Sequence, residues 1–555
     1  MNARAISSWA GIRWFCATNV LLAVLLCGGL TSGCAKGRDP AASEPKKILR
    51  LSQRNEPSDL DPATATLPDE FFIIRALCEG LVAPAPVTMA EATPEAVVLP
   101  AAAERWEKTD DGLTYTFHLR PTATWSNGEP VTADDFLNSY RRILTPSTGA
   151  PKAALFFMVK NAQAFAAGKL TDFSAVGFQV VDRLTFRITL ERPMPEFLLY
   201  VASGPWLPIN ERVIAAHGRA WTRPENYVGN GPFVLTEWRP NQRIITTRNP
   251  RYHRPSAVKL DEIHFMGIDS ADTEERAFRA EQLDVTMTVP FAKIGGYVRD
   301  RPGEIHRAPL AETRFLSFNT QREPLRDRRV RTALSMAIDR ELITRQLLHG
   351  GHLPADRLVP PPLRGKVDDA SGPTPSLDLD SDRARTLLAE AGFPGGRGFP
   401  RLELTTWVNS PITEVIQQMW KRELGIEVGL AIREAKVHVS ALREGNYDIA
   451  FITAIPDVAD AANLLEEFIS NAPGNYPHWS DRRFDELMEL AKNETDRTKR
   501  NAALLAAEDR LMEQSPLAPL YFNSKNWLMS SRVRGWQHDS LWTRFYLDLE
   551  VIDPE

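Results

Sequence analysis

The sequence predicts an α/β protein in which strands and helices are mixed along the chain from residue 48 onward. Polar and apolar residues alternate in segments such as 114–119, which is the period of a half-buried strand. Apolar residues recur at helical spacing in segments such as 327–348, where they line one face. The chain has 555 residues, and because a domain commonly has roughly 100–200 residues, two to four domains are expected.

The strands are predicted from alternation, or from short apolar runs bounded by turn residues. Pro240 and Asn241 join segments 233–235 and 243–247 as a strand pair. The apolar run 447–453 is predicted to be a strand that ends shortly before Pro456 and Asp457. In chain order the predicted strands are 48–51, 114–119, 182–190, 233–235, 243–247, 315–319, 402–407, 426–432 and 447–453, after which residues 516–521 begin the return to the first domain.

The helices are predicted from an apolar face together with recognisable ends. Thr132 and Asp135 have the spacing of a capping box, and a helix through Tyr140 follows and ends before Pro146. Gly392 stops another helix. In chain order the predicted helices are 69–82, the segment after Thr132, 327–348, 381–391, 412–424 and most of 484–511, and residues 354–375 are predicted to form a long surface loop.

The first 33 residues have the features of a secretory signal peptide. Arg4 and Arg13 are their only charged side chains, an apolar run covers 14–30, and small residues precede Cys34. The Ser-Gly-Cys ending resembles a bacterial lipobox, so Cys34 is the predicted lipidation site, and two acyl chains make stable anchoring. Residues 34–47 are predicted to be a flexible tether. A transmembrane anchor is the alternative, but the glycines at 28 and 29 interrupt a run that should reach about 20 residues.

The cysteine count argues against a disulfide-stabilised protein, and the net charge argues against a nucleic-acid-binding protein. Cys16 and Cys27 lie in the predicted signal and Cys34 would be acylated, so Cys78 is the one free thiol left, without a disulfide framework. Removal of residues 1–33 would lower the formal net charge from −5 to −7. An acidic chain of this kind is not expected to bind nucleic acid.

A search for catalytic motifs gives no enzyme class. The sequence has no Gly-x-Ser-x-Gly, His-Glu-x-x-His, Cys-x-x-Cys or phosphate-loop pattern. His349 and His352 flank a Gly-Gly pair and could hold a metal, but no other ligand type clusters with them, so a solvated loop is favoured. We therefore predict a protein that is not an enzyme and has no metal site or cofactor.

Ordered blocks of residues resemble a known family. Residues 56–62 (EPSDLDP), 79–82 (EGLV), 116–120 (TFHLR) and 125–136 (WSNGEPVTADDF) are similar to the first half of bacterial extracytoplasmic solute-binding proteins of family 5, the peptide-binding lipoproteins of ABC importers. Residues 230–233 (NGPF), 248–252 (RNPRY), 330–340, 445–448 (GNYD) and 516–521 (PLAPLY) continue the likeness in order. Most of these residues are interpreted as scaffold that does not touch a ligand.

The resemblance implies a periplasmic-binding-protein-like, two-lobed fold of type II, class C, with an extra domain. Lobe I would comprise residues 48–82, 206–308 and 524–555, the extra domain 83–205, and lobe II 309–523. Strands near 315–319 and 516–522 would form the hinge. The implied function is capture of dipeptides or oligopeptides for the permease subunits of an ABC transporter. The protein would be a monomer that lies outside the plasma membrane and is held to a membrane, which the sequence does not specify, through the lipid anchor.

The resemblance also implies where a ligand is held. A peptide would bind as an added extended strand, and Asp457 would receive its α-ammonium group, with Thr453, Ala454 and Ile455 on the same wall. Glu434 belongs to this predicted site as well. The family often has tryptophans where Ala435 and Ala454 stand, and its oligopeptide members have Arg at Phe451, so this cleft should be wider and recognise ligand ends differently. The alternative to a ligand role is that Asp457 caps the next helix.

Two other functions stay open at this point. The same fold could bind a non-peptide ligand, such as a metal chelate, an oligosaccharide or an opine. An exported hydrolase that cleaves what it binds is the alternative of another class.

Overall fold

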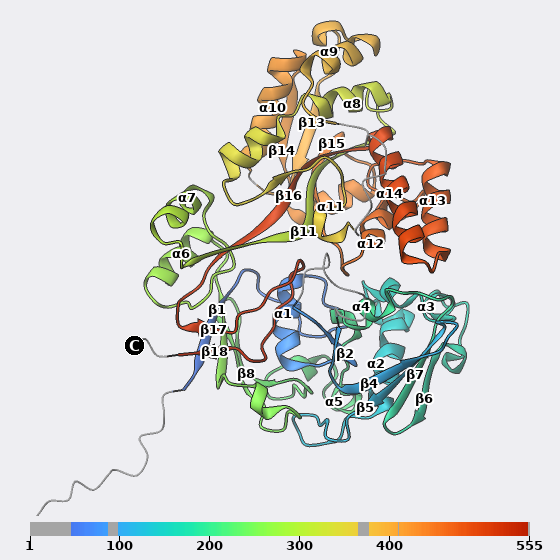
Figure 1. Cartoon of the computed structure of the whole chain (residues 1–555), viewed down its shortest axis with the longest axis vertical. Coiled ribbons are helices and arrows are strands. Elements are labelled where there is room, and N and C mark those ends of the chain that lie inside the picture. The colour runs from blue at the N-terminus through green and yellow to red at the C-terminus, as the bar shows by residue number, and fades with distance from the viewer. Residues whose placement is uncertain (1–45, 87–97, 365–376, 409, 553–555) are drawn as a thin grey trace, which may run out of the picture. The chain divides into compact units, whose positions relative to one another are not determined.

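The computed structural model describes residues 46–86, 98–364, 377–408 and 410–552 of the chain (Figure 1). The predicted signal peptide, Cys34 and all of the predicted tether except Lys46 and Lys47 lie outside these residues. The described residues belong to one compact unit, Lys46–Glu555. Within them, no helix combines the length and the apolar character that crossing a bilayer requires.

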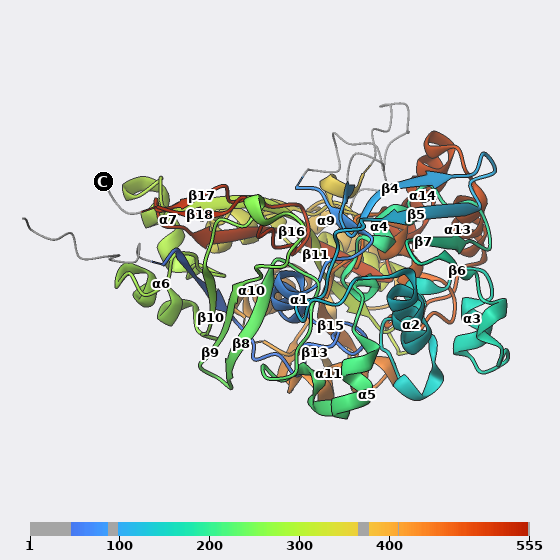
Figure 2. The ribbon, with the colours of Figure 1, turned by 90° about the horizontal axis from the view of Figure 1, so that it is seen from below.

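The first of three main sheets has the strand order β1-β10-β9-β8. Its strands are β1 (Ile48–Gln53), β8 (Phe233–Arg239), β9 (Arg243–Arg248) and β10 (Glu262–Gly267), which lie side by side in Figure 2. The predicted strand pair across Pro240 and Asn241 is confirmed as the antiparallel pair β8–β9. Helix α1 (Pro68–Leu77) contributes Ile73 and Leu77 to the core that this sheet shares.

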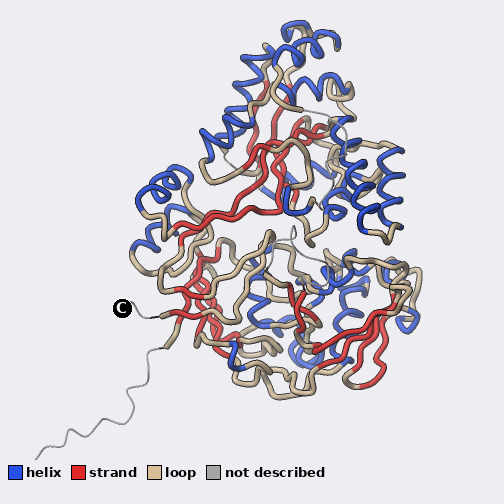
Figure 3. Tube along the Cα trace, viewed as in Figure 1, coloured by secondary structure: helices blue, strands red, loops and turns tan. Residues whose placement is uncertain are grey.

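The second sheet, β4-β5-β7-β6, belongs to the stretch between residues 98 and 206 (Figure 3). It contains β4 (Ala103–Lys108), β5 (Thr114–Leu119), β6 (Phe178–Asp182) and β7 (Thr185–Thr189), and helix α2 (Ala133–Leu144) packs on it. Trp206 is fully buried in this core. Its ring stacks on Phe156 with centroids 4.2 Å apart, and Tyr140 meets it edge-on at 4.9 Å.

The third sheet has six strands in the order β12-β16-β11-β15-β13-β14, and strands β13, β14 and β15 are parallel. Residues of α8, α9 and α10 form one of the apolar clusters on this sheet, and residues of α12, α13 and α14 form another. The strands are β11 (Ile305–Phe318), β12 (Leu353–Pro354), β13 (Leu402–Thr406), β14 (Val428–Ile432), β15 (Ile449–Ala454) and β16 (Leu517–Leu528). The helices are α8 (Arg328–Met336), α9 (Ser381–Glu390), α10 (Pro411–Leu424), α11 (Ala435–Arg443), α12 (Ala461–Leu465), α13 (Arg482–Asn493) and α14 (Arg497–Gln514).

Strands β11 and β16 form a long antiparallel ribbon that leads from the surroundings of α6 (Ala271–Arg279) and α7 (Phe291–Asp300) into the third sheet (Figure 1). The pairing is interrupted twice, at Arg314–Phe315 and, more widely, where the register passes from Pro309 opposite Ser524 to Thr313 opposite Phe522. Three residues of β11 therefore face a single residue of β16, which is a β-bulge that bends the strand. The sequence prediction covered only the end of β11, at 315–319.

One predicted helix is wrong in part. Segment 327–348 was expected to be a single amphipathic helix, but α8 ends at Met336 and a short π-helix, Leu342–Leu348, follows. Arg340 lies between the two pieces and is buried, and its guanidinium donates to the carbonyls of Pro519 and Leu377 at 2.7 and 2.8 Å. An apolar periodicity does not reveal that a buried cation takes its partners from other segments.

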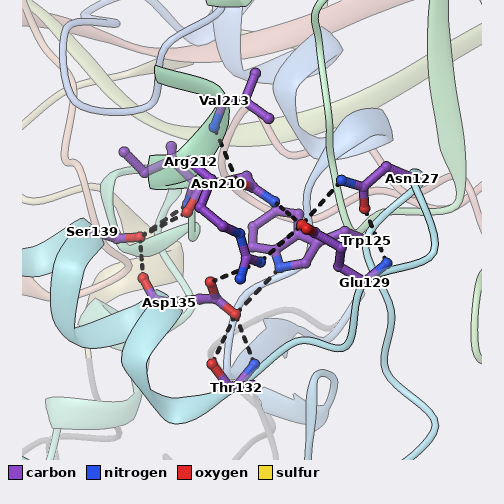
Figure 4. A network of polar contacts seen from close by, with 10 residues as sticks. Trp125, Asn127, Glu129, Thr132, Asp135, Ser139, Asn210, Arg212 and Val213 are labelled. Carbon is purple, nitrogen blue, oxygen red and sulfur yellow. Dashed lines mark hydrogen bonds and ion pairs between the residues drawn. The ribbon is translucent and has the colours of Figure 1, made fainter. Parts of the chain in front are cut away.

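The turn and helix start near Trp125 form a closed network of hydrogen bonds (Figure 4). The predicted capping box is confirmed, since the Thr132 amide donates to Asp135 Oδ2 at 2.8 Å. Trp125 Nε1 donates to the same carboxylate oxygen at 3.3 Å, and Arg212 lies 2.9 Å from Glu129. Because these groups bond to one another, they hold the turn against the helix, as their interpretation as scaffold requires.

A second scaffold cluster brings three sequence blocks together around Glu79. Its backbone amide donates to Asn230 Oδ1 at 2.9 Å, and its carboxylate accepts from the Tyr252 hydroxyl at 2.5 Å and from Arg254 at 3.1 Å. The adjacent Gly229 lies so close to Leu77 that an added Cβ would overlap the Leu77 carbonyl oxygen.

We expect Gly229→Ala to lower the free energy of unfolding by about 1–3 kcal/mol, because the new methyl group displaces the backbone of α1. Gly295→Ala is the matched control. Its site in helix α7 has no atom within 4 Å of the added Cβ, so the substitution should raise stability by about 0.5–1 kcal/mol. Urea unfolding followed by circular dichroism measures both changes, and equal effects would contradict the close contact at Gly229.

Candidate functional site

A cavity of about 300 Å³ lies where several separated parts of the chain meet. The loop after β15 and residues of the β11 bulge form part of its wall, and α1 and the segment after α4 (Phe197–Val201) form other parts. Most of the lining side chains are apolar. They include Leu67, Pro68, Phe71, Leu155, Leu199, Ile455, Pro456, Val458, Leu541 and Trp542.

The loop after β15 is placed by the parallel strands of the third sheet. In open α/β sheets, ligands bind beside the carboxyl ends of the strands, because loops from neighbouring strands meet there. Here the loop turns through Pro456 and is fixed by Asn463, whose side-chain oxygen accepts from the Asp457 amide at 2.7 Å. Asp460 then caps helix α12. Residues 455–459 of this loop line the cavity.

The structure brings Asp457 and Ile455 together at the cavity, and both line it. The Asp457 carboxylate forms an ion pair with Lys152, which comes from the stretch 98–206. The Asp457 side chain is 40% exposed and that of Lys152 is 22% exposed, so water still reaches the pair. A cation of the protein therefore already occupies the carboxylate that was predicted to receive a ligand's α-ammonium group.

The other predicted site residues lie in different surroundings. Ala454 is buried in the apolar core, and the hydroxyl of Thr453 is buried with no hydrogen-bond partner. Glu434 is exposed and caps helix α11, where its carboxylate accepts from the amides of Lys436 and Val437 at 3.0 and 3.1 Å. These two hydrogen bonds lower the pKa of Glu434. Glu434 is not among the residues that line this cavity.

Several cavity residues could not be found by the sequence reasoning. Glu312 is buried in the bulge of β11, and its carboxylate accepts from Asn523 at 2.7 Å and from the Trp542 indole. Asp539 accepts from the Leu541 amide at 3.0 Å. No local motif marks Glu312, because it gains its partners from segments more than 200 residues away in the sequence.

The carboxylates that line the cavity have partners within the protein. None of the residues that line the cavity is a histidine or a cysteine, and the carboxylates are held by hydrogen bonds or by Lys152. Among the described residues, no group of three or more His, Cys, Asp or Glu side chains is arranged to hold a metal. Cys78 is buried beside the Tyr227 hydroxyl, and burial raises the pKa of its thiol to about 12, which makes it unreactive.

A buried ion-pair cluster lies next to the loop that carries Asp457. Arg500 of α14 donates to Asp460 at 2.6 Å and lies 3.1 Å from Glu196. All three side chains are less than 10% exposed. Burial, together with repulsion from Asp460, outweighs the attraction of Arg500 and raises the pKa of Glu196 to about 7. The cluster ties the stretch 98–206 to helices α12 and α14.

The chain is similar to known proteins over most of its length. Residues 97–476 match the family described as bacterial extracellular solute-binding proteins, family 5 Middle. The chain is 33% identical to the probable deoxycholate-binding periplasmic protein YgiS of Escherichia coli K12, over 88% of this chain and 91% of that protein. It is 30% identical to the oligopeptide-binding protein OppA of Bacillus subtilis 168, over 94% and 96% of the two chains. The solved Escherichia coli murein tripeptide binding protein MppA superposes with a TM-score of 0.80 at 30% identity, covering 92% of this chain and 99% of the other.

Proposed function

Because this chain belongs to the bacterial extracellular solute-binding proteins of family 5, we propose that it captures peptides outside the plasma membrane and delivers them to the permease subunits of an ABC transporter. The observation that carries the proposal is the cavity between α1, the stretch 98–206 and the loop after β15. Two of the relatives of near-full coverage described above are named for peptide binding. It acts as a binding protein and not as a hydrolase.

The proposed export route rests on the sequence of the first 47 residues. A signal peptide at 1–33, acylation at Cys34 and a tether at 34–47 would hold the protein on a membrane surface, as a monomer. Each of the three parts proposed above, lobe I, the extra domain and lobe II, contains most or all of one main sheet, and β11 and β16 cross from lobe I into lobe II. Separate apolar clusters around the first, second and third sheets support a division into lobe I, extra domain and lobe II.

Asp457 is the proposed contact for the α-ammonium group of a peptide, with Thr453, Ala454 and Ile455 as the wall beside it and Glu434 as a more distant member of the site. Its position on the cavity wall supports this role. Since Lys152 is paired with Asp457, a ligand ammonium group must displace or share this cation. An incoming charge gains less where the carboxylate is already neutralised.

We therefore expect Asp457→Asn to weaken binding of free-amine peptides about tenfold, because one charge-assisted hydrogen bond is lost. Lys152→Met should leave this affinity unchanged or raise it, since it removes the competing cation. Isothermal titration calorimetry with defined tripeptides measures both, and N-acetylated tripeptides provide the control that Asp457→Asn should not affect. An unchanged affinity of both peptide sets for Asp457→Asn would remove Asp457 from the site.

Two outcomes decide the function itself. Native mass spectrometry of the purified protein with a defined peptide library should show intact bound peptides, whereas shortened peptides would indicate hydrolysis. The apolar lining of the cavity, together with the likeness to a probable deoxycholate-binding relative, favours one second candidate, a non-peptide amphipathic ligand. Identification of whatever co-purifies with the protein, including chelates, oligosaccharides and opines, distinguishes it from peptide capture.

A further inference from the structure

Arg314 is a cation without an anion. It lies on β11, two residues beyond the cavity residue Glu312, and is half-buried. Its Nη1 atom is buried and has no hydrogen-bond partner, and no ion pair joins Arg314 to any described residue. A buried charge without a partner is costly unless another molecule supplies one. The guanidinium is therefore available to a ligand.

Aromatic rings hold the guanidinium in place. Its central carbon lies 5.7 Å from the ring centroid of Trp407 and 5.7 Å from that of Phe451. Such cation–π contacts orient an arginine without using its N–H groups, so these groups remain free to donate to a planar anion. Trp407 follows the carboxyl end of β13, and Phe451 lies on β15.

Other polar groups near this guanidinium also have no partner. Thr453 lies directly opposite Arg314 in the β11–β15 pairing, and its buried hydroxyl makes no hydrogen bond. His438 packs on Trp407 with ring centroids 5.3 Å apart, is 1% exposed and has no partner for either ring nitrogen. Buried polar atoms in folded proteins are satisfied as a rule. Several orphaned groups around one cation indicate a site that is completed by a bound molecule.

The strand register connects this place with the cavity. Arg314 comes two residues after Glu312 on β11, and its pairing partner Thr453 comes two residues before Ile455, so both lie close along the chain to residues that line the cavity. Glu312 and Ile455 line the cavity, whereas the next pair inward, Leu316 and Phe451, belongs to the apolar core. Arg314 and Thr453 thus lie, along their strands, between residues that line the cavity and residues of the apolar core.

From these contacts we propose that Arg314 is the anchor for a carboxylate group of the ligand, with Thr453 and His438 as additional hydrogen-bonding groups. The proposal rests on the proposed function and deepens it, since it assigns a charge to the ligand. Lys152 already neutralises Asp457 and leaves Arg314 uncompensated, so the preferred ligand carries a carboxylate beside an apolar body. That carboxylate belongs either to the C-terminus of a peptide or to an amphipathic acid.

The test compares Arg314→Met with Arg307→Met, an exposed arginine on the same strand. Methionine keeps the contact with Trp407 and Phe451 but removes the charge. The probes are defined tripeptides as free acids and as C-terminal amides, and deoxycholate as a non-peptide carboxylate. In wild-type protein the acid should bind roughly 10–100 times more tightly than the amide, as expected for a charge-assisted bidentate pair. Arg314→Met should abolish this preference, whereas Arg307→Met should keep it.

The outcomes separate the two proposals. Loss of the acid preference with tripeptides assigns the carboxylate to peptides. If wild-type protein binds deoxycholate but no tripeptide, and Arg314→Met loses that affinity, the carboxylate belongs to an amphipathic acid and peptide capture is rejected. An acid preference that Arg314→Met leaves unchanged overturns the role of Arg314. If wild-type protein binds none of the probes, the proposed function fails, and thermal unfolding decides on Arg314. If Arg314 has no anion in the unliganded protein, its charge does not stabilise the fold, and unliganded Arg314→Met should have a melting temperature no lower than that of wild type. A lower melting temperature would overturn the proposal.

Discussion

Replacement of Arg500 by methionine should lower the free energy of unfolding by about 3–5 kcal/mol, because it leaves two buried carboxylates without their shared cation. The Glu196 and Asp460 side chains are 9% and 5% exposed, so water cannot take the place of the guanidinium. Urea unfolding at pH 8 measures the loss. Arg497→Met, at an exposed position in the same helix, is the control and should change stability by less than about 0.5 kcal/mol.

The pH dependence of this loss provides an independent check. The pKa of Glu196 is raised to about 7, above its ordinary value of 4.5, so the folded protein binds a proton at Glu196 that the unfolded chain releases between these values. At pH 5.5 one of the two carboxylates is protonated, and the effect of Arg500→Met should be smaller than at pH 8. An equal loss at both pH values would show that the charge on Glu196 does not determine the energy of the cluster.

The second large effect is expected at Trp206, which fills the core of the second sheet. Trp206→Ala should cost about 3–5 kcal/mol, since it leaves a cavity and removes the stacked contact with Phe156 and the edge-on contact with Tyr140. Trp206→Phe retains part of this contact and should cost clearly less. Pro205 and Leu155 line the ligand cavity next to this core, so the alanine variant should also bind ligand more weakly.

Thermal unfolding and calorimetric titration of the two Trp206 variants measure these effects side by side. If alanine and phenylalanine variants were equally stable, the packing around Trp206 would contribute little. If the alanine variant lost stability but kept full affinity, the wall formed by Pro205 and Leu155 would not depend on this core.

The fold was predictable wherever short-range patterns determine the structure. Alternation located β5 at its observed bounds, Thr114–Leu119, and the capping box located the start of α2. The two-lobed fold that the resemblance implied is confirmed by solved relatives of near-full coverage. Strand β11 was predicted only at its end, because the bulge after Pro309 and the polar residues near it break the alternation.

The candidate site was predictable only through the position of one loop. The resemblance placed Asp457 and Ile455 on a common wall, and both line the cavity. It could not supply Lys152, because that partner lies 305 residues earlier in the chain and no local pattern marks it. Arg314 remained unnoticed for the same reason, since its lack of a partner is a property of its surroundings in space.

The bulge in the ribbon of β11 and β16 has a consequence for signalling to a transporter. The residues that interrupt the pairing, among them Ala311 and Glu312, are also residues that line the cavity. A ligand in the cavity would therefore contact the interrupted part of the ribbon. If ligand binding shifts the equilibrium between two bends of the ribbon, then a partner that fixes one bend must change the affinity for the ligand by the same factor. A transporter that recognises one curvature of this ribbon would thereby distinguish a loaded receptor from an empty one.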